Sequence, residues 1–344
     1  MKKTKSIFIT LSLLIIHIVL FMILIQNPET NNSIQKSSLD ISSSNVSNNF
    51  TGIEMKINKT GIYLPSNEKG CIRTDRKIKK TNKNFSSLIH EPYHGAIIID
   101  AITGKILFEK HASSFCYPAS VTKLMTLLIT LESIDNGVIS LEDKIIVNNE
   151  IAGIGGSQLH LDPKEKDFTV EDMLYAIMVH SANDAARALS IHIAGSKNKF
   201  VKLMNNKAEE LGMNSTIYHS EHGLPPDNDN EQADISTPYD IALLALACLR
   251  HSETIKYTSK ELIYLGERKV MCVTRNPLIK KINGYIGCDG LKTGFIKRGG
   301  WSLVATAEKN KKRIISVVLG CKERDVRDSI SRKFLDQGFK DIED

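Results

Sequence analysis

The sequence predicts an α+β domain in which helices pack on an antiparallel sheet, and three observations support this fold class. Residues 96–100 and 105–110 alternate as two strands around a Thr-Gly turn, near the start of the compact part of the chain. Residues 303–307 and 313–319 form a second strand pair near its end. Helical segments lie between the two pairs, so we expect the first and last strands to meet in one sheet.

The first helical segment is apolar on every side. Residues 121–134 follow Pro118 and Ser120 and contain almost no polar stripe. Because a surface helix keeps one polar face, this pattern predicts a buried helix whose N-terminus carries Ser120.

Further helices are expected along the middle of the chain. Thr169 and Asp172 have the spacing of a capping box, which predicts a helix over residues 170–180. Residues 184–194 and 200–211 have helical patterns as well.

The N-terminal segment differs from the rest of the chain. Three lysines precede a mostly apolar run, residues 6–25, which as a helix would span about 30 Å. The positive charges before it predict that the rest of the chain lies outside the cytoplasm. No small-x-small cleavage site follows, so residues 1–25 are interpreted as a signal-anchor in preference to a cleaved signal peptide. Cleavage would instead give a secreted protein.

Residues 26–91 are rich in Asn, Ser and Lys and have few apolar clusters, which predicts a tether. The compact domain is then expected over residues 92–344. The formal net charge of the chain is +6, and its basic residues are scattered without interleaved aromatic residues. This distribution argues against a nucleic-acid partner. The membrane is the partner expected for the N-terminal helix.

The six cysteines follow no disulfide framework and include no Cys-x-x-Cys pair. A domain of this size needs no disulfide to fold, although an exported chain permits one. We expect thiols that are free or partly buried, and we expect neither a metal nor another cofactor.

Three short motifs occur in a fixed order along the predicted domain. Each pattern is common by itself, so their order and separation carry the information. The motifs are Ser120-Val121-Thr122-Lys123, Ser181-Ala182-Asn183 and Lys292-Thr293-Gly294.

The first motif has the residues for nucleophilic catalysis. Ser120 and Lys123 are three positions apart on one helix, so their side chains share a face. A serine hydroxyl needs a base, and a lysine serves as one only if burial and a neighbouring cation lower its pKa. We expect the apolar helix to bury Lys123 and Lys292 to be the cation. The helix N-terminus would direct N–H groups toward a developing oxyanion.

The other two motifs supply groups around this pair. Ser181 and Asn183 fall in a loop between helices, where Ser181 is expected to relay a proton and Asn183 to orient the base or bind a substrate amide. Lys292 and Thr293 fall in a predicted edge strand and are expected to hold a carboxylate. Gly294 would let a peptide approach and add as a strand. An isolated copy of either motif is explained equally well by a helix cap or a turn.

From about residue 93 to residue 339 the chain resembles the D-alanyl-D-alanine carboxypeptidases, the low-molecular-weight penicillin-binding proteins of serine peptidase family S11. This resemblance implies a penicillin-binding-protein/β-lactamase-like fold. The matching segments extend beyond the nine motif residues and are Pro118–Thr126, Ser181–Ala186, Leu211–Thr216, His222–Leu224 and Asp289–Phe295.

The resemblance also implies a reaction. Ser120 would attack the carbonyl between the two terminal D-alanines of a peptidoglycan stem pentapeptide, and water would then cleave the acyl-enzyme, with β-lactams as inhibitors. The backbone N–H groups of Ser120 and Phe295 match the family's oxyanion hole. Arg275 and Arg327 line up with arginines at the family's substrate site.

Two other activities stay open beside the carboxypeptidase. A D,D-endopeptidase acting on cross-linked peptidoglycan would share the same site, as would a non-catalytic penicillin-binding protein of the envelope. The complete motifs disfavour the non-catalytic alternative. A β-lactamase is disfavoured because no Glu-x-x-Leu-Asn lies between the second and third motifs. The protein is thus expected to be a single-pass membrane protein with an extracytoplasmic catalytic domain.

Overall fold

The structure is a computed structural model that describes residues 57–58, 61–62, 91–226 and 232–343. All of these belong to the second of two units of the chain, residues 53–344. The predicted membrane segment and most of the predicted tether lie outside the described residues. Over the described ranges, the helices are too short or too polar to span a bilayer.

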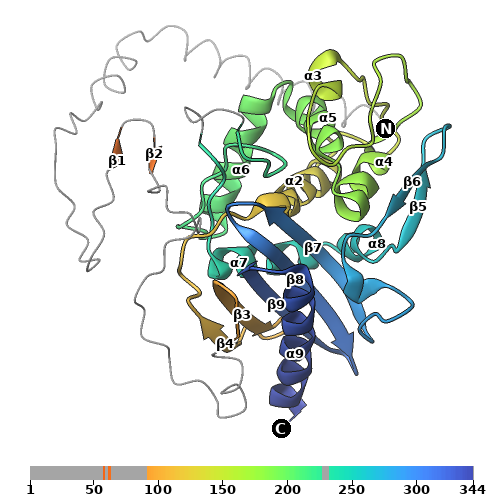
Figure 1. Cartoon of the computed structure of the whole chain (residues 1–344). Helices are drawn as coiled ribbons and strands as arrows, with labels where there is room; N and C mark the ends of the chain where they lie inside the picture. The colour runs from red at the N-terminus through yellow and green to blue at the C-terminus, as the bar shows by residue number, and fades with distance from the viewer. Residues whose placement is uncertain (1–56, 59–60, 63–90, 227–231, 344) are drawn as a thin grey trace, which may run out of the picture. The chain divides into compact units, whose positions relative to one another are not determined.

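A five-stranded antiparallel sheet forms the centre of the domain, with the strand order β4-β3-β9-β8-β7 (Figure 1). Strand β3 pairs with β9, so the expectation that the first and last strands meet is confirmed. Strands β8 and β9 are longer than predicted because only Asn310 and Lys311, both with positive φ, connect them. The strands are β3 (Gly95–Asp100), β4 (Ile106–Lys110), β7 (Cys288–Ile296), β8 (Gly300–Lys309) and β9 (Lys312–Cys321).

Helices cover both faces of this sheet. Alternate residues of β3 point to opposite faces: Ile97 joins the core that contains α2 and α7, whereas Ile98 joins the core under α9. Phe334 of α9 packs edge-on against Phe108 of β4. The helices of the domain are α2 (Lys123–Asp135), α3 (Asn149–Ala152), α4 (Val170–Tyr175), α5 (Asn183–Ala194), α6 (Lys197–Glu210), α7 (Pro238–Arg250), α8 (Thr254–Thr258) and α9 (Arg324–Glu343).

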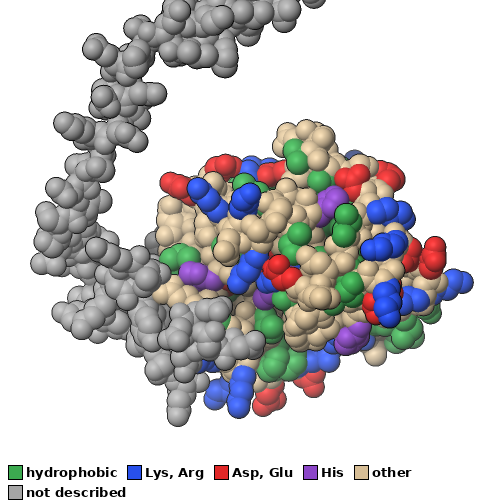
Figure 2. All heavy atoms as spheres, turned by 90° about the horizontal axis from the view of Figure 1, so that it is seen from above, with side chains coloured by type: hydrophobic (Ala, Val, Ile, Leu, Met, Phe, Trp, Pro, Cys, Tyr) green, Lys and Arg blue, Asp and Glu red, His purple; other side chains and the backbone are tan. Residues whose placement is uncertain are grey.

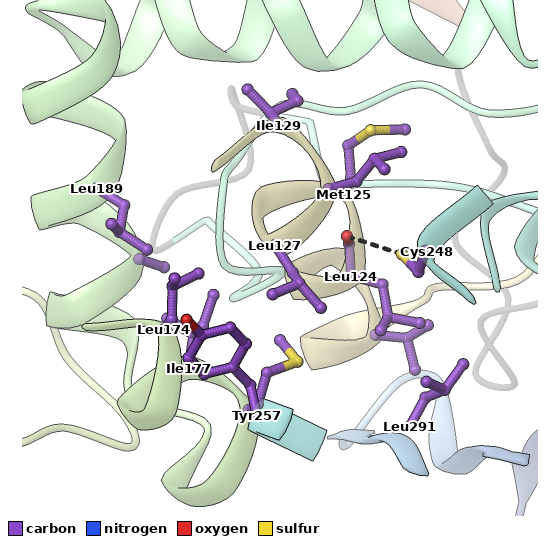
Figure 3. Close-up of a cluster of buried hydrophobic side chains, with 14 of the residues drawn as sticks. Leu124, Met125, Leu127, Ile129, Leu174, Ile177, Leu189, Cys248, Tyr257 and Leu291 are labelled. Atoms are coloured by element: carbon purple, nitrogen blue, oxygen red, sulfur yellow. Dashed lines mark hydrogen bonds between the residues drawn. The ribbon is translucent and has the colours of Figure 1, made fainter. Parts of the chain in front are cut away.

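Helix α2 lies in the middle of the larger core, which explains why its sequence is apolar all round. Every residue from Lys123 to Leu131 is buried. Figure 3 shows its side chains directed toward different neighbours, among them Leu174 of the α4 segment, Leu189 of α5 and Cys248 of α7. The predicted buried helix is therefore confirmed.

The structure differs from the predicted elements in three places. Ser120 lies in a separate 3₁₀ turn, η3 (Ala119–Thr122), and not in the first turn of α2. The capping box at Thr169 is confirmed, but after residue 175 the helix widens into a π-helix, η4 (Ala176–His180). A separate hairpin, β5 (Leu262–Leu265) with β6 (Val270–Val273), was not predicted.

Charged side chains of both signs are mixed on the surface of the domain. On the face shown in Figure 2, basic and acidic side chains are interspersed, and neither forms a continuous field. Cys248, Cys272, Cys288 and Cys321 carry free thiols, as expected, while Cys71 lies outside the described residues.

Candidate active site

The first motif forms a turn that places its serine beside its lysine. Ala119 has a positive φ of 50°, which turns the backbone just before Ser120. The Nζ of Lys123 lies 3.1 Å from the Oγ of Ser120 and donates a hydrogen bond to it. The two side chains therefore meet as their spacing predicted, although a 3₁₀ turn and not an α-helix brings them together.

Lys123 is completely buried and its ammonium has fixed partners. Its Nζ donates to Asn183 Oδ1 at 2.7 Å and to the carbonyl of His222 at 2.8 Å. Burial lowers the pKa of Lys123 to about 7, and the nearby carboxylates, Glu221 and Asp234 foremost, oppose this shift. The predicted repulsion between Lys123 and Lys292 is present, and it contributes to the lowered pKa of Lys292.

The second motif reverses the chain between two helices. Ser181 ends η4 in the left-handed conformation, with φ 65°, and α5 begins at Asn183. The Oγ of Ser181 accepts a hydrogen bond from Lys292 Nζ at 3.0 Å. The amide of Asn183 donates to the carbonyl of Gly155 at 2.8 Å, so its oxygen is held toward the first motif.

The third motif lies on β7, which is an edge strand of the sheet as predicted. Lys292 is buried, and its Nζ also donates to the carbonyl of Thr293 at 3.1 Å. Burial holds the pKa of Lys292 well below its usual range, and the positive charges of Lys123, Arg275 and Arg327 lower it further.

Gly294 is needed for the contact between β7 and the nucleophile turn. A Cβ built at this position would lie 2.7 Å from the carbonyl oxygen of Pro118 and 3.2 Å from Cγ2 of Val121. The missing side chain therefore makes room for η3. Gly294 also lines the cleft, and its role in the approach of a substrate stays a prediction.

The three motifs border one cleft with a volume of about 560 Å³. Lys123, Asn183 and Lys292 lie behind its wall. Phe295 is half-exposed at the rim and stacks on Trp301, with 4.0 Å between ring centroids. The cleft is lined by Ser120, Ser157, His180, Ser181, Met271, Val273, Thr274, Arg275, Thr293, Gly294, Phe295, Trp301, Arg324 and Arg327.

The two arginines predicted for the site are in different environments. Arg327 is buried, and its Nε donates to Asp328 at 2.7 Å, so its charge is already paired. Arg275 is exposed and donates to the hydroxyl of Ser157 at 3.2 Å. Both line the cleft, but the charge of Arg275 is the more available to a substrate anion.

The buried carboxylate of Asp234, which was not predicted to belong to the site, stabilises the η3 turn that carries Ser120. Asp234 accepts hydrogen bonds from the backbone N–H groups of His219 (2.7 Å) and Ser220 (2.9 Å) and from the hydroxyl of Thr122 (2.8 Å). It thereby joins η3 to the loop whose residue His222 holds Lys123. Burial raises the pKa of Asp234 to about 6. Since 112 residues separate Thr122 from Asp234, no local pattern could have indicated the contact.

The loop that contains His222 also packs closely against the η3 turn. Gly223 has a positive φ of 80°, and a Cβ there would lie 1.9 Å from the carbonyl oxygen of Ala119. Only glycine fits this approach. Beside it, Glu221 is fully buried and pairs with Arg187 at 2.6 Å. Ser120 and Lys123 therefore rest on a tightly constrained segment.

Ser120 is hydrogen-bonded to the buried Lys123 beside an edge strand of an antiparallel sheet. This is the arrangement of the penicillin-recognising serine peptidases. The family model for D-alanyl-D-alanine carboxypeptidase, peptidase S11, matches residues 90–323. The chain belongs to this family.

Relatives of known sequence agree with this membership. The D-alanyl-D-alanine carboxypeptidase DacF of Bacillus subtilis is 38% identical over 268 residues, covering 77% of this chain and 66% of that protein. DacC of Escherichia coli, with the same activity in its name, is 33% identical over 255 residues, covering 72% and 61%. The chain thus spans between three fifths and two thirds of the length of these two relatives.

Solved structures share the fold. Penicillin-binding protein D2 from Listeria monocytogenes, in its ampicillin-bound form, aligns with a TM-score of 0.65 and 31% identity, covering 73% of this chain and 99% of that one. The carboxypeptidase DacD from Francisella tularensis aligns with a TM-score of 0.67 and 27% identity, covering 77% and 73%.

Proposed function

We propose that this protein is a serine-type D-alanyl-D-alanine carboxypeptidase that removes the terminal D-alanine from peptidoglycan stem pentapeptides and is acylated by β-lactams. One observation carries the proposal: the hydroxyl of Ser120 is 3.1 Å from the ammonium nitrogen of a lysine whose pKa is lowered to about 7. Family membership and the named activity of the relatives support it.

Acylation begins with neutral Lys123. Its Nζ takes the proton of Ser120 while Oγ bonds to the carbonyl carbon of the penultimate D-alanine. The carbonyl oxygen becomes an oxyanion, for which the backbone N–H groups of Ser120 and Phe295 are the proposed donors. Asn183 and the carbonyl of His222 keep Lys123 aimed at the hydroxyl during this transfer.

Release of D-alanine requires a proton on its nitrogen. Ser181 borders the cleft and is bonded to Lys292, so we assign the proton delivery to the Ser181 hydroxyl, which Lys292 orients. The proton that Lys123 took from Ser120 passes through the Ser181 hydroxyl to this nitrogen, so the C–N bond breaks, D-alanine leaves, and Lys123 is neutral again. Water then attacks the ester on Ser120. Lys123 accepts a proton from the water and returns it to Oγ of Ser120 as the ester C–O bond breaks and the shortened peptide departs.

The substrate carboxylate needs a cationic partner in the cleft. Arg275 and Thr293 line it and present a positive charge and a hydroxyl. Arg327 is assigned a supporting role, since Asp328 already pairs its charge.

Mass spectrometry of the full chain in detergent tests the proposal. Incubation with benzylpenicillin is expected to add the mass of the drug to the peptide that contains Ser120, and incubation with a stem pentapeptide to release D-alanine. Both should vanish in Ser120→Ala. Label on another residue, or label that persists in the variant, would refute the assignment.

We also propose that residues 6–25 anchor the protein in the membrane and that residues 26–91 tether the catalytic domain outside it. The support is the length and charge pattern of the sequence. Cell fractionation with intact-mass analysis is expected to find the complete N-terminus in the membrane fraction. A form in the medium that starts between about residues 26 and 45 would show a secreted enzyme instead.

A further inference from the structure

The β5–β6 hairpin presents an apolar face to solvent. Register places four side chains on this face, since residues 262 and 264 lie directly opposite residues 273 and 271. The alternate residues Leu265 and Cys272 are buried in the main core and fix the hairpin to the domain. We call the exposed set the apolar ladder; its members and exposed fractions are Leu262 (45%), Tyr264 (57%), Met271 (56%) and Val273 (38%).

The ladder is continuous with the catalytic cleft. Met271 and Val273 line the same cleft as Ser120, and Arg275 follows two positions further along the chain. The backbone N–H of Arg275 donates to the carbonyl of Val179 at 3.3 Å, in the π-helix that ends just before Ser181. This hydrogen bond fixes the segment that follows the hairpin to the π-helix that precedes the second motif.

The cleft also offers a place for an extended peptide. Strand β7 is at the end of the sheet among the described strands, so one of its edges has no strand partner there and offers backbone groups to an added strand. Side chains of an extended peptide alternate between opposite sides. Thr293 and Phe295 of β7 line the cleft together with Met271 and Val273 of β6, so a peptide bound there would meet apolar groups of the hairpin.

We propose that the apolar ladder binds the peptide chain of the substrate beyond its two terminal D-alanines, through the aliphatic parts of its side chains. This inference rests on the proposed function. Continuity with the cleft identifies the substrate as the occupant, because a chain that leaves the cleft across β6 passes over Met271 and then Tyr264. Exposed apolar groups that adjoin a site contribute affinity through burial of their surface.

The test compares long and short ligands on the full chain in detergent. Tyr264→Thr and Leu262→Thr remove apolar surface of the ladder at positions that do not line the cleft, and they keep a residue that favours strands. Ile146→Thr is the matched control, because Ile146 is 74% exposed and does not line the cleft. The ligands are a stem pentapeptide, N-acetyl-D-alanyl-D-alanine and benzylpenicillin.

We expect kcat/KM for the pentapeptide to fall about tenfold in each ladder variant, as for the loss of one buried apolar side chain. The short dipeptide and the rate of penicillin acylation should change less than twofold, and Ile146→Thr should leave all three unchanged. Equal losses on all ligands, or no loss on the pentapeptide, would overturn the proposal. Failure of wild-type protein to react with penicillin would refute the proposed function instead.

Discussion

The two buried lysines of the cleft lie in regions of opposite charge. Lys123, on the helical side, is surrounded by the carboxylates of Glu221, Asp234 and Asp184, whereas Lys292, on the sheet edge, is near other cations. Burial lowers the pKa of both. The negative charges hold the pKa of Lys123 at about 7, whereas the positive neighbours of Lys292 add to the effect of burial and lower its pKa more.

This difference is consistent with the separate roles that we propose for the two lysines. A group that accepts a proton near neutral pH needs a pKa close to 7, which burial balanced by carboxylates provides for Lys123. The pKa of Lys292 is lowered by burial and by its positive neighbours, and its ammonium nitrogen is engaged in hydrogen bonds within the site. Lys292 is bonded to Ser181, which agrees with its proposed role of orienting that hydroxyl.

The largest effect is expected from removal of the helical-side lysine. Lys123→Ala should slow penicillin acylation of Ser120 by about 10²- to 10⁴-fold, because the serine loses its base. The rate is measured by intact-mass analysis over time, with circular dichroism as the control for folding. A loss below tenfold would contradict the role of Lys123 as base.

A smaller effect is expected from the sheet-edge lysine. Lys292→Met keeps the apolar stem and removes the hydrogen bond to Ser181, so acylation should fall by about 10²-fold. The pH at which acylation is half-maximal should stay near 7, since burial and carboxylates set the pKa of Lys123. A large shift of this midpoint would show that Lys292 controls the base.

Gly294→Ala tests the contact between the two regions. The new methyl group would collide with the carbonyl of Pro118, so the free energy of unfolding should fall by about 1–3 kcal/mol. Urea unfolding gives this value. Unchanged stability together with lost acylation would return the glycine to the substrate-approach role that the sequence suggested.

The smallest effect is a change in pH dependence. Asp234→Asn keeps the shape of the side chain and removes a negative charge that favours protonated Lys123, so the acid limb of acylation should move to lower pH. The matched control is Asp240→Asn, which removes another buried carboxylate, bonded to Ser215 and Thr216. A uniform fall in the acylation rate, with no shift of the acid limb of the pH profile, would show that the role of Asp234 is structural only.

Local patterns predicted the elements that local physics controls. The capping box at Thr169 and the all-apolar helix were predicted in this way. The pairing of the first and last strands is not local, and it was predicted from the order of strands and helices along the chain. Helix α7 was missed, although Thr237 caps it and Pro238 occupies its first turn. Both residues are helix-start signals that the sequence itself contains.

The site was predictable only as far as its motifs reach. Ser120, Ser181 and Lys292 come together as their order indicated. The bracing by Asp234 and the collision that Gly294 avoids depend on contacts between segments far apart in the chain. No pattern within either segment indicates these two contacts, so neither of them was predicted.

The pH dependence of Ser120 acylation by benzylpenicillin tests the central claim most directly. The second-order rate constant, measured from pH 5 to pH 9 on the full chain, should rise as a single proton leaves, with its midpoint near 7, the pKa of Lys123. The sign follows because only the neutral amine accepts the serine proton, and its fraction grows with pH. A rate that is flat across pH 7, or that rises only toward the ordinary pKa of lysine, would contradict the account.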